Sequence, residues 1–143
     1  MKKILFGLIA GLCVAANVQA QSNAMGPFAT PSGELQFVRD DRDFVATYDR
    51  QIFDRFDAKT LAHFDAPADA SGKLARTLVQ TEAGPVLYDF RRNPPLVQRT
   101  GKRMTVQRVF WQGEEVVMQG SQGWYRFQRG ALTKLQSSTS IYH

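Results

Sequence analysis

The sequence has almost no cysteine. Its single cysteine, Cys13, lies near the N-terminus of a 143-residue chain. One thiol cannot form an intramolecular disulfide framework or a zinc site with paired cysteines, so both are excluded. The chain must therefore be stabilised by an ordinary hydrophobic core. Ten Phe, four Tyr and two Trp supply large side chains for it.

The sequence also lacks an apolar run of the roughly 20 residues that a membrane-spanning helix needs. The chain opens with Met1-Lys2-Lys3, continues with the uncharged stretch 4–16, and reaches Val18-Gln19-Ala20. A positive end, a short apolar middle and small residues at a cleavage site are typical of a secretory signal peptide. We expect cleavage after Ala20, export to the periplasm or beyond, and no membrane span afterwards. A membrane anchor is the alternative.

The remaining residues predict one domain. Residues 21–33 contain Gly26, Pro27, Pro31 and Gly33, which interrupt regular structure, so a flexible leader is expected there. Residues 34–143 are expected to form a single β-rich globular domain, without an internal repeat.

Closely spaced turn residues mark the C-terminal part of the chain. Between them lie short runs rich in β-branched and aromatic residues, at 74–80, 86–90, 104–111, 115–119, 124–128 and 131–135. Such runs predict an antiparallel meander, folded as a small barrel or sandwich, because the links are too short for parallel crossovers. Tyr125 and Phe127 alternate with Arg126 and Gln128, which places the aromatic and polar side chains on opposite faces.

Residues 40–64 allow two interpretations. Phe44, Tyr48, Ile52 and Phe56 recur every four residues, which favours an amphipathic helix started by the acids at 40–43. The rival is a hairpin that pairs residues 35–38 with 44–48. The expected fold is mainly β with one N-terminal helix, and α+β is possible.

Catalytic and metal-binding patterns are scarce. The two histidines are His63 and His143, and no glycine-rich phosphate loop is present. A small hydrolase would have to combine His63 with Asp65 or Asp89. The sequence therefore favours a protein that is not an enzyme and has no metal or cofactor.

Charge is distributed unevenly along the chain. Nine acidic and five basic side chains between Glu34 and Asp69 give −4, whereas four acidic and eleven basic ones between Ala70 and His143 give +7. This asymmetry predicts either an anion-binding face or two halves that neutralise each other in the fold.

The densest basic segment runs from Arg91 to Arg108, and aromatic residues follow it. Arginine beside aromatic rings suits phosphates, carboxylates and flat groups. We predict a binding face for an anionic envelope component or an acidic protein, whereas nucleic acid is not expected from so modest a net charge. The oligomeric state is not indicated. The candidate site residues are Arg91, Arg92, Arg99, Lys102, Arg103, Arg108, Trp111, Trp124, Tyr125 and Arg126.

The loop at Gly120–Gly123 suggests another function. Ser121-Gln122-Gly123-Trp124-Tyr125 resembles the serine-glycine-tyrosine loop of periplasmic lysozyme inhibitors, which are small exported β-barrels whose loop enters the lysozyme cleft. The likeness covers five residues, with different spacing and without that family's cysteines, so it assigns no family. It makes an inhibitor or immunity protein for a cell-wall enzyme or toxin the alternative function.

Overall fold

The computed structural model describes residues 17–19 and 21–135. The described residues form antiparallel strands and no helix. The strands are β1 (Asn17–Gln19), β2 (Phe28–Thr30), β3 (Gly33–Asp40), β4 (Asp43–Tyr48), β5 (Gln51–Asp57), β6 (His63–Asp65), β7 (Arg76–Thr81), β8 (Gly84–Asp89), β9 (Leu96–Arg99), β10 (Val106–Gln112), β11 (Glu115–Gly120), β12 (Gly123–Gln128) and β13 (Ala131–Lys134).

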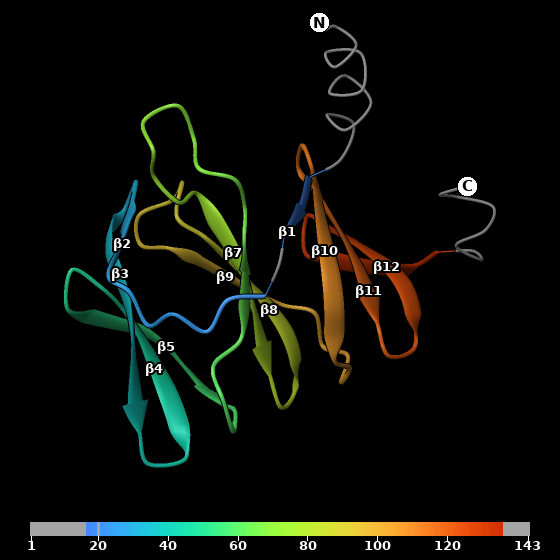
Figure 1. The fold of residues 1–143 in the computed structure, drawn as a ribbon, viewed down its shortest axis with the longest axis horizontal. Coiled ribbons are helices and arrows are strands. Elements are labelled where there is room, and N and C mark those ends of the chain that lie inside the picture. Colours follow the sequence, from blue (N-terminus) through green and yellow to red (C-terminus); the bar gives the residue numbers. More distant parts are fainter. Residues whose placement is uncertain (1–16, 20, 136–143) are drawn as a thin grey trace, which may run out of the picture.

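These strands form three sheets, which Figure 1 shows as successive layers. The N-terminal sheet has the order β2-β3-β4-β5, the middle sheet β6-β7-β8-β9, and the C-terminal sheet β1-β10-β11-β12-β13. Apart from β1, each sheet is a meander of strands consecutive in sequence, as expected from short links between antiparallel strands. The mainly β, antiparallel class is confirmed, and the architecture is a stack of three sheets.

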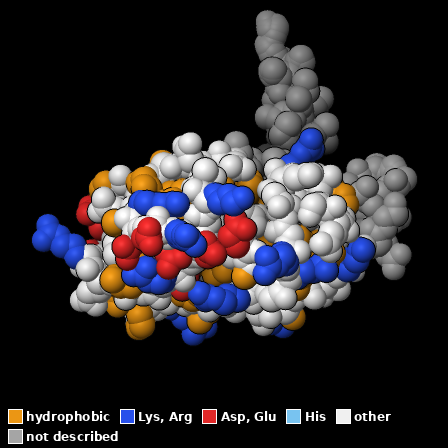
Figure 2. Space-filling view, turned by 90° about the horizontal axis from the view of Figure 1, so that it is seen from below, with side chains coloured by type: hydrophobic (Ala, Val, Ile, Leu, Met, Phe, Trp, Pro, Cys, Tyr) orange, Lys and Arg blue, Asp and Glu red, His pale blue; other side chains and the backbone are white. Residues whose placement is uncertain are grey.

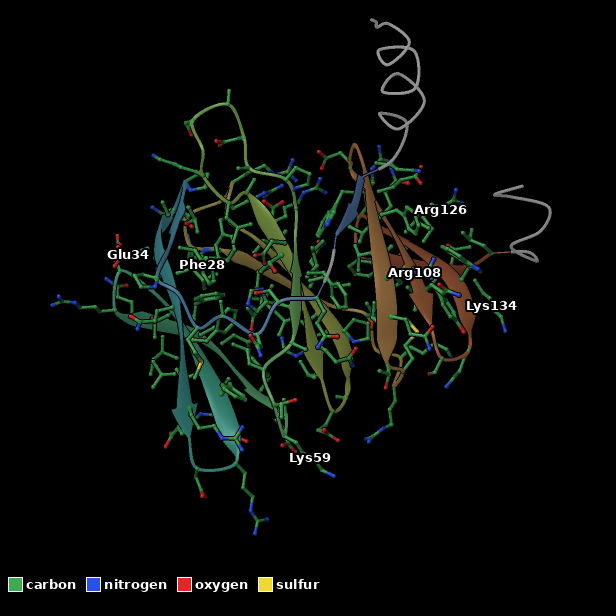
Figure 3. The ribbon with its side chains drawn as sticks, viewed as in Figure 1. Phe28, Glu34, Lys59, Arg108, Arg126 and Lys134 are labelled. Carbon is green, nitrogen blue, oxygen red and sulfur yellow. The ribbon has the colours of Figure 1, made fainter. Side chains whose placement is uncertain are left out.

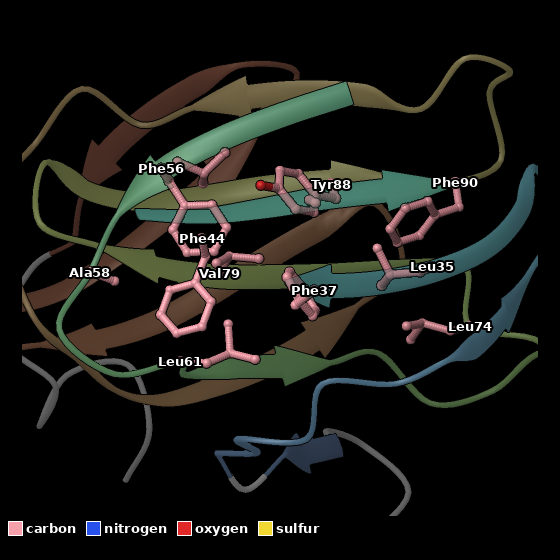
Figure 4. Packing of buried hydrophobic residues seen from close by; sticks show 12 residues of the cluster. Leu35, Phe37, Phe44, Phe56, Ala58, Leu61, Leu74, Val79, Tyr88 and Phe90 are labelled. Atoms are coloured by element: carbon pink, nitrogen blue, oxygen red, sulfur yellow. The ribbon is translucent and has the colours of Figure 1, made fainter. Parts of the chain in front are cut away.

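The middle sheet is buried on both faces. Leu78 and Val79 are neighbours on β7 and therefore point to opposite faces. Val79 joins the core shared with the N-terminal sheet, and Leu78 joins the core shared with the C-terminal sheet. Phe37 and Tyr88 are fully buried in the first of these cores, which Figure 4 shows from close by. The described residues thus form two apolar layers, which hold the three sheets together.

Two tight hairpin turns determine where arginines emerge. Asp49 and Arg50 link β4 to β5, and Arg129 and Gly130 link β12 to β13. All four residues have positive φ angles, of 45°, 69°, 54° and 77°. Two-residue turns with positive φ at both positions match the twist of the flanking strands. Arg50 and Arg129 therefore both lie at the tips of tight hairpin turns, the first in the N-terminal sheet and the second in the C-terminal sheet.

The helix expected within 40–64 is wrong. Residues 43–48 and 51–57 form β4 and β5, and residues 63–65 form β6, so the hairpin alternative describes this segment. Phe44 and Phe56 face each other directly across β4 and β5, with ring centroids 5.7 Å apart. Two of the residues that suggested a helix stripe, Phe44 and Phe56, are therefore a cross-strand aromatic pair.

Residues 21–33, expected to be a flexible leader, make specific contacts. Phe28–Thr30 is strand β2, paired with β3, and the backbone of Ser22 exchanges two hydrogen bonds with that of His63. Thr30 and Ser32 are buried. This segment is thus attached to both the N-terminal and the middle sheet.

The expected signal peptide lies outside the described residues except for 17–19. Those three residues form β1, which pairs with Val109, Phe110 and Trp111 of β10. Cleavage after Ala20 would remove β1 and leave β10 at the edge of the C-terminal sheet. Among the described residues, no helix has the length and apolarity needed to cross a membrane.

Candidate functional site

The ten sequence-predicted site residues do not gather at one place. They divide among an ion-paired link between the N-terminal and middle sheets, a cleft between two sheets, the outer face of the C-terminal sheet, and a groove at the loop ends. Two of the three aromatic residues, Trp111 and Tyr125, are buried in the core between the middle and C-terminal sheets. The neighbours of each group decide which of its arginines can meet a ligand.

Arg99 is neutralised by the N-terminal sheet. Its guanidinium lies 2.7 Å from Asp54 Oδ1, and the buried Tyr88 hydroxyl donates a hydrogen bond of 2.5 Å to Asp54 Oδ2. Burial, with added repulsion from the Asp54 charge, raises the pKa of Tyr88 well above its ordinary value, so the phenol stays a donor. Arg99 therefore serves to link β5 with β8 and β9, as two complementary halves would require.

Arg91 is neutralised locally. Its guanidinium forks between Asp89, at 2.7 Å, and Glu114, at 2.8 Å. Burial opposes ionisation of Asp89, but the bonds and charge of Arg91 outweigh it and lower the pKa of this carboxyl. Arg91 likewise lowers the pKa of Glu114. The two carboxylates stay ionised and occupy most of the donors of Arg91.

Arg76 is a buried cation without a direct carboxylate. It donates to the carbonyl oxygen of Gly113 at 2.6 Å, and its guanidinium lies 5.0 Å from the ring centroid of Trp111. Burial, followed by repulsion from Arg91, lowers the pKa of Arg76. The backbone carbonyl and the indole ring stabilise this charge only partly.

Arg76 and Arg91 line a cleft of about 410 Å³ between the middle and C-terminal sheets. Arg92 and Arg129 line it too, and among the described residues neither has a carboxylate within ion-pair distance. Leu87, Leu96 and Phe127 provide apolar lining. We call this site the arginine cleft, defined by Arg76, Asp89, Arg91, Arg92, Glu114 and Arg129.

The outer face of the C-terminal sheet carries a second group of cations. Arg108 and Phe110 of β10, and Trp124 and Arg126 of β12, alternate with core residues and therefore share the face turned away from the middle sheet. The rings of Phe110 and Trp124 lie 5.6 Å apart. Figure 3 places Arg108 and Arg126 on this side of the sheet. We call these four residues the cationic face.

Neither cation of this face is neutralised. No carboxylate in the described part of the chain lies within ion-pair distance of Arg108 or Arg126. Glu115 is the one acidic residue in the strands of the C-terminal sheet. In the face that Figure 2 shows, acidic and basic side chains interleave toward the N-terminal sheet, whereas scattered basic side chains lie without acidic ones toward the C-terminal sheet.

The other predicted residues lie elsewhere. Lys102 places its ammonium 5.8 Å from the ring centroid of buried Tyr125. Arg103 lines a separate groove of about 630 Å³, together with Lys59, Ser121 and Gln122. Thr105 accepts a backbone hydrogen bond from Ser121, which holds the Gly120–Gly123 loop against the β9–β10 link.

His63 is a structural residue. Its side chain is fully buried, Nδ1 lies 2.6 Å from Asp65 Oδ1, and Nε2 lies 2.9 Å from the carbonyl oxygen of Ala24. Burial lowers its pKa, but Asp65 and the Ala24 carbonyl outweigh burial, so the pKa is raised. Both ring nitrogens face acceptors, so the doubly protonated form satisfies both contacts. No nitrogen is left to accept a substrate proton.

Sequence reasoning missed Arg76, Phe110 and Arg129. Phe110 had a usable signal, because it stands two residues from Arg108 and so shares its face in a strand. Arg76 and Arg129 are separated by more than 50 positions from each other, and only the stacking of sheets brings them to one cleft. Within the described ranges, no group of three His, Cys, Asp or Glu side chains could hold a metal ion.

Comparison with known proteins gives no relative: no family model matches this chain, and neither curated proteins nor solved structures include a significant match.

Proposed function

We propose that this protein is an exported binding module without catalytic activity, and that its cationic face binds an acidic polymer of the cell envelope. The observation that carries the proposal is the arrangement of Arg108 and Arg126 beside the Phe110–Trp124 ring pair, with no carboxylate in the described residues to neutralise either cation.

The geometry suits a repeating anion. Arg108 and Arg126 stand on β10 and β12, with β11 between them, and Arg126 is offset by two residues from the position opposite Arg108, so their Cα atoms lie roughly 12 Å apart. A polymer with carboxylates or phosphates at regular intervals can meet both. The partly buried Phe110 and Trp124 stand on the same face and would add apolar contact at the edges of their rings. An acidic protein is the other partner that this surface chemistry allows.

The test is binding of the chain beginning at Gln21 to immobilised polygalacturonate over a series of salt concentrations. The double variant Arg108→Glu/Arg126→Glu should weaken binding at low salt by about tenfold or more, because two attractive contacts become repulsive. The matched control is Arg42→Glu/Arg50→Glu, which changes the net charge equally at exposed arginines of the N-terminal sheet. We expect the control to stay within about twofold of wild type. Equal losses in both double variants would refute the assignment.

A second candidate function has one observation in its favour. Ser121 and Gln122 are exposed at the tip of the β11–β12 hairpin and line the loop-end groove with Arg103. A short loop held by backbone bonds is a rigid element that an inhibitor could insert into an enzyme cleft. Inhibition of a lysozyme by wild type, abolished in Ser121→Arg and retained in Arg108→Glu/Arg126→Glu, would favour this function. Absence of inhibition of cell-wall hydrolases would exclude it.

A further inference from the structure

We propose that the arginine cleft is a binding site for a small organic anion that carries carboxylate or phosphate groups. The site is separate from the cationic face: its residues come from β7, β8, the segment after β8, and the turns that follow β10 and β12. This proposal can therefore be tested independently of the proposed polymer binding.

The balance of charge in the cleft favours an anion. Four guanidiniums line it, from Arg76, Arg91, Arg92 and Arg129, against the two carboxylates of Asp89 and Glu114. Both carboxylates are engaged by Arg91. This leaves an excess of two positive charges in a partly enclosed space between sheets, where electrostatic attraction is less screened than on an open surface.

Arg76 gives the strongest reason to expect a bound anion. It is 9% exposed, yet its guanidinium donates to the carbonyl oxygens of Gly113 and Glu114 and not to a carboxylate. Asp89 and Glu114 attract this guanidinium without bonding to it, and Arg91 repels it, so an anion in the cleft would add the direct counter-charge that a buried cation favours. Arg76 thus has a reason to be in the cleft that packing alone does not give.

The turn at residues 129–130 brings another arginine to the cleft. Arg129 has φ of 54°, a conformation that side chains other than Gly and Asn seldom adopt. A Cβ added to Gly130 would stand 3.4 Å from Gln98 Nε2, so the turn packs closely against β9. The contact holds the turn against β9, and Arg129 lines the cleft together with Arg92.

The size and lining define the ligand class. A cleft of about 410 Å³ falls in the lower part of the ~300–1,000 Å³ range of small-molecule sites. Leu87, Leu96 and Phe127 can contact a short apolar body, while the amides of Gln98 and Gln128 can bond hydroxyl or carbonyl groups. A dicarboxylate or a phosphate ester of a few carbons matches these features.

The experiment titrates the chain from Gln21 onward with succinate and with inorganic phosphate, at constant ionic strength held with chloride. Isothermal calorimetry should show saturable binding of at least one probe, with a dissociation constant of about 1 mM or tighter. Arg92→Gln/Arg129→Gln should weaken it by about tenfold or more. Arg42→Gln/Arg50→Gln is the matched control and should leave it unchanged, since neither residue lines the cleft; Arg50, like Arg129, lies in a two-residue turn and has a positive φ.

Backbone amide shifts of the wild-type protein provide a readout that does not depend on variants. Saturable shifts centred on residues 91–92 and 128–130 support the site. Shifts that match those caused by chloride, or binding that survives in Arg92→Gln/Arg129→Gln, would overturn it. Arg108→Glu/Arg126→Glu should bind the small probes as wild type does, so failure of this inference is distinguishable from failure of the proposed polymer binding.

Discussion

The N-terminal and C-terminal sheets handle charge in different ways. On the N-terminal sheet, Arg55 lies between Asp40, at 2.8 Å, and Asp43, at 3.2 Å, and Asp54 neutralises Arg99 from the middle sheet. On the C-terminal sheet, Arg108 and Arg126 have no such carboxylate in the described residues. Part of the charge asymmetry of the sequence is therefore neutralised by ion pairs inside the fold, and part of it remains as arginines of the C-terminal sheet without a neighbouring carboxylate in the described residues.

The largest expected effect concerns the link between the two halves. Asp54→Ala should destabilise the protein by about 2–4 kcal/mol, because it leaves the buried Tyr88 hydroxyl and the Arg99 guanidinium without their acceptor. Asp57→Ala, at an exposed position of the same strand, should cost about 0.5 kcal/mol or less. Urea unfolding followed by tryptophan fluorescence measures both. Similar losses at the two positions would mean that the Asp54 link contributes nothing special.

The next largest effect is the pH dependence of the unfolding free energy, which tests how His63 attaches the segment 21–33 to the fold. The pKa of His63 is raised in the folded state above its ordinary value of 6.5. The stabilisation it provides is therefore complete below about pH 6.5 and is lost as pH rises through the folded-state pKa. Unfolding free energy measured between pH 5 and 9 should fall across that window, and His63→Gln should flatten the fall. A wild-type curve without such a fall would contradict the Asp65 and Ala24 contacts.

Loss of the Arg91 fork should have a smaller effect. Arg91→Gln should cost about 1 kcal/mol, since Arg91 and Glu114 are substantially exposed and solvent screens the pair. Because the pKa values of Asp89 and Glu114 are lowered, their stabilisation is present near neutral pH and is lost as pH falls toward the folded-state values. The variant should show a shallower acid-side decline than wild type. If the variant lost stability with falling pH as steeply as wild type, Arg91 would not be the cause of the lowered pKa values of Asp89 and Glu114.

The smallest expected effect is on the edge of the C-terminal sheet. A chain that begins at Gln21 lacks β1, so the backbone of residues 109–111 loses its outer partner. Amide hydrogen exchange should accelerate there and stay unchanged in β12, with little change in global stability, because local opening need not involve the core. Protection at residues 109–111 equal to that of the full chain would indicate that another strand has replaced β1.

The meander of the C-terminal half could be predicted from sequence because its turns and its alternation are local signals. Tyr125 and Phe127 indeed face the core while Arg126 faces outward. The helix error at 40–64 has an equally local cause. Residues four apart share a face in a strand as well as in a helix, so Phe44 and Tyr48 could not separate the two. Ile52 was not on that stripe at all, since it is 64% exposed beyond a bulge.

The site could be predicted only in part. Arginines close in sequence were grouped together, but pairing is decided by the fold: Arg99 meets Asp54, which stands 45 positions earlier. The burial of β8 on both faces could not be predicted either. The alternating pattern of its sequence indicates one apolar face, whereas in the fold a sheet covers each face. Long-range partners of this kind leave no pattern in a single sequence.

The most direct test of the account is to titrate isotope-labelled protein with a soluble polygalacturonate fragment and follow backbone amide shifts. The account predicts saturable shifts concentrated on residues 108–110 and 124–126, weakening as salt is raised. Shifts spread equally over the exposed arginines of the N-terminal sheet, or absent from β10 and β12, would contradict it.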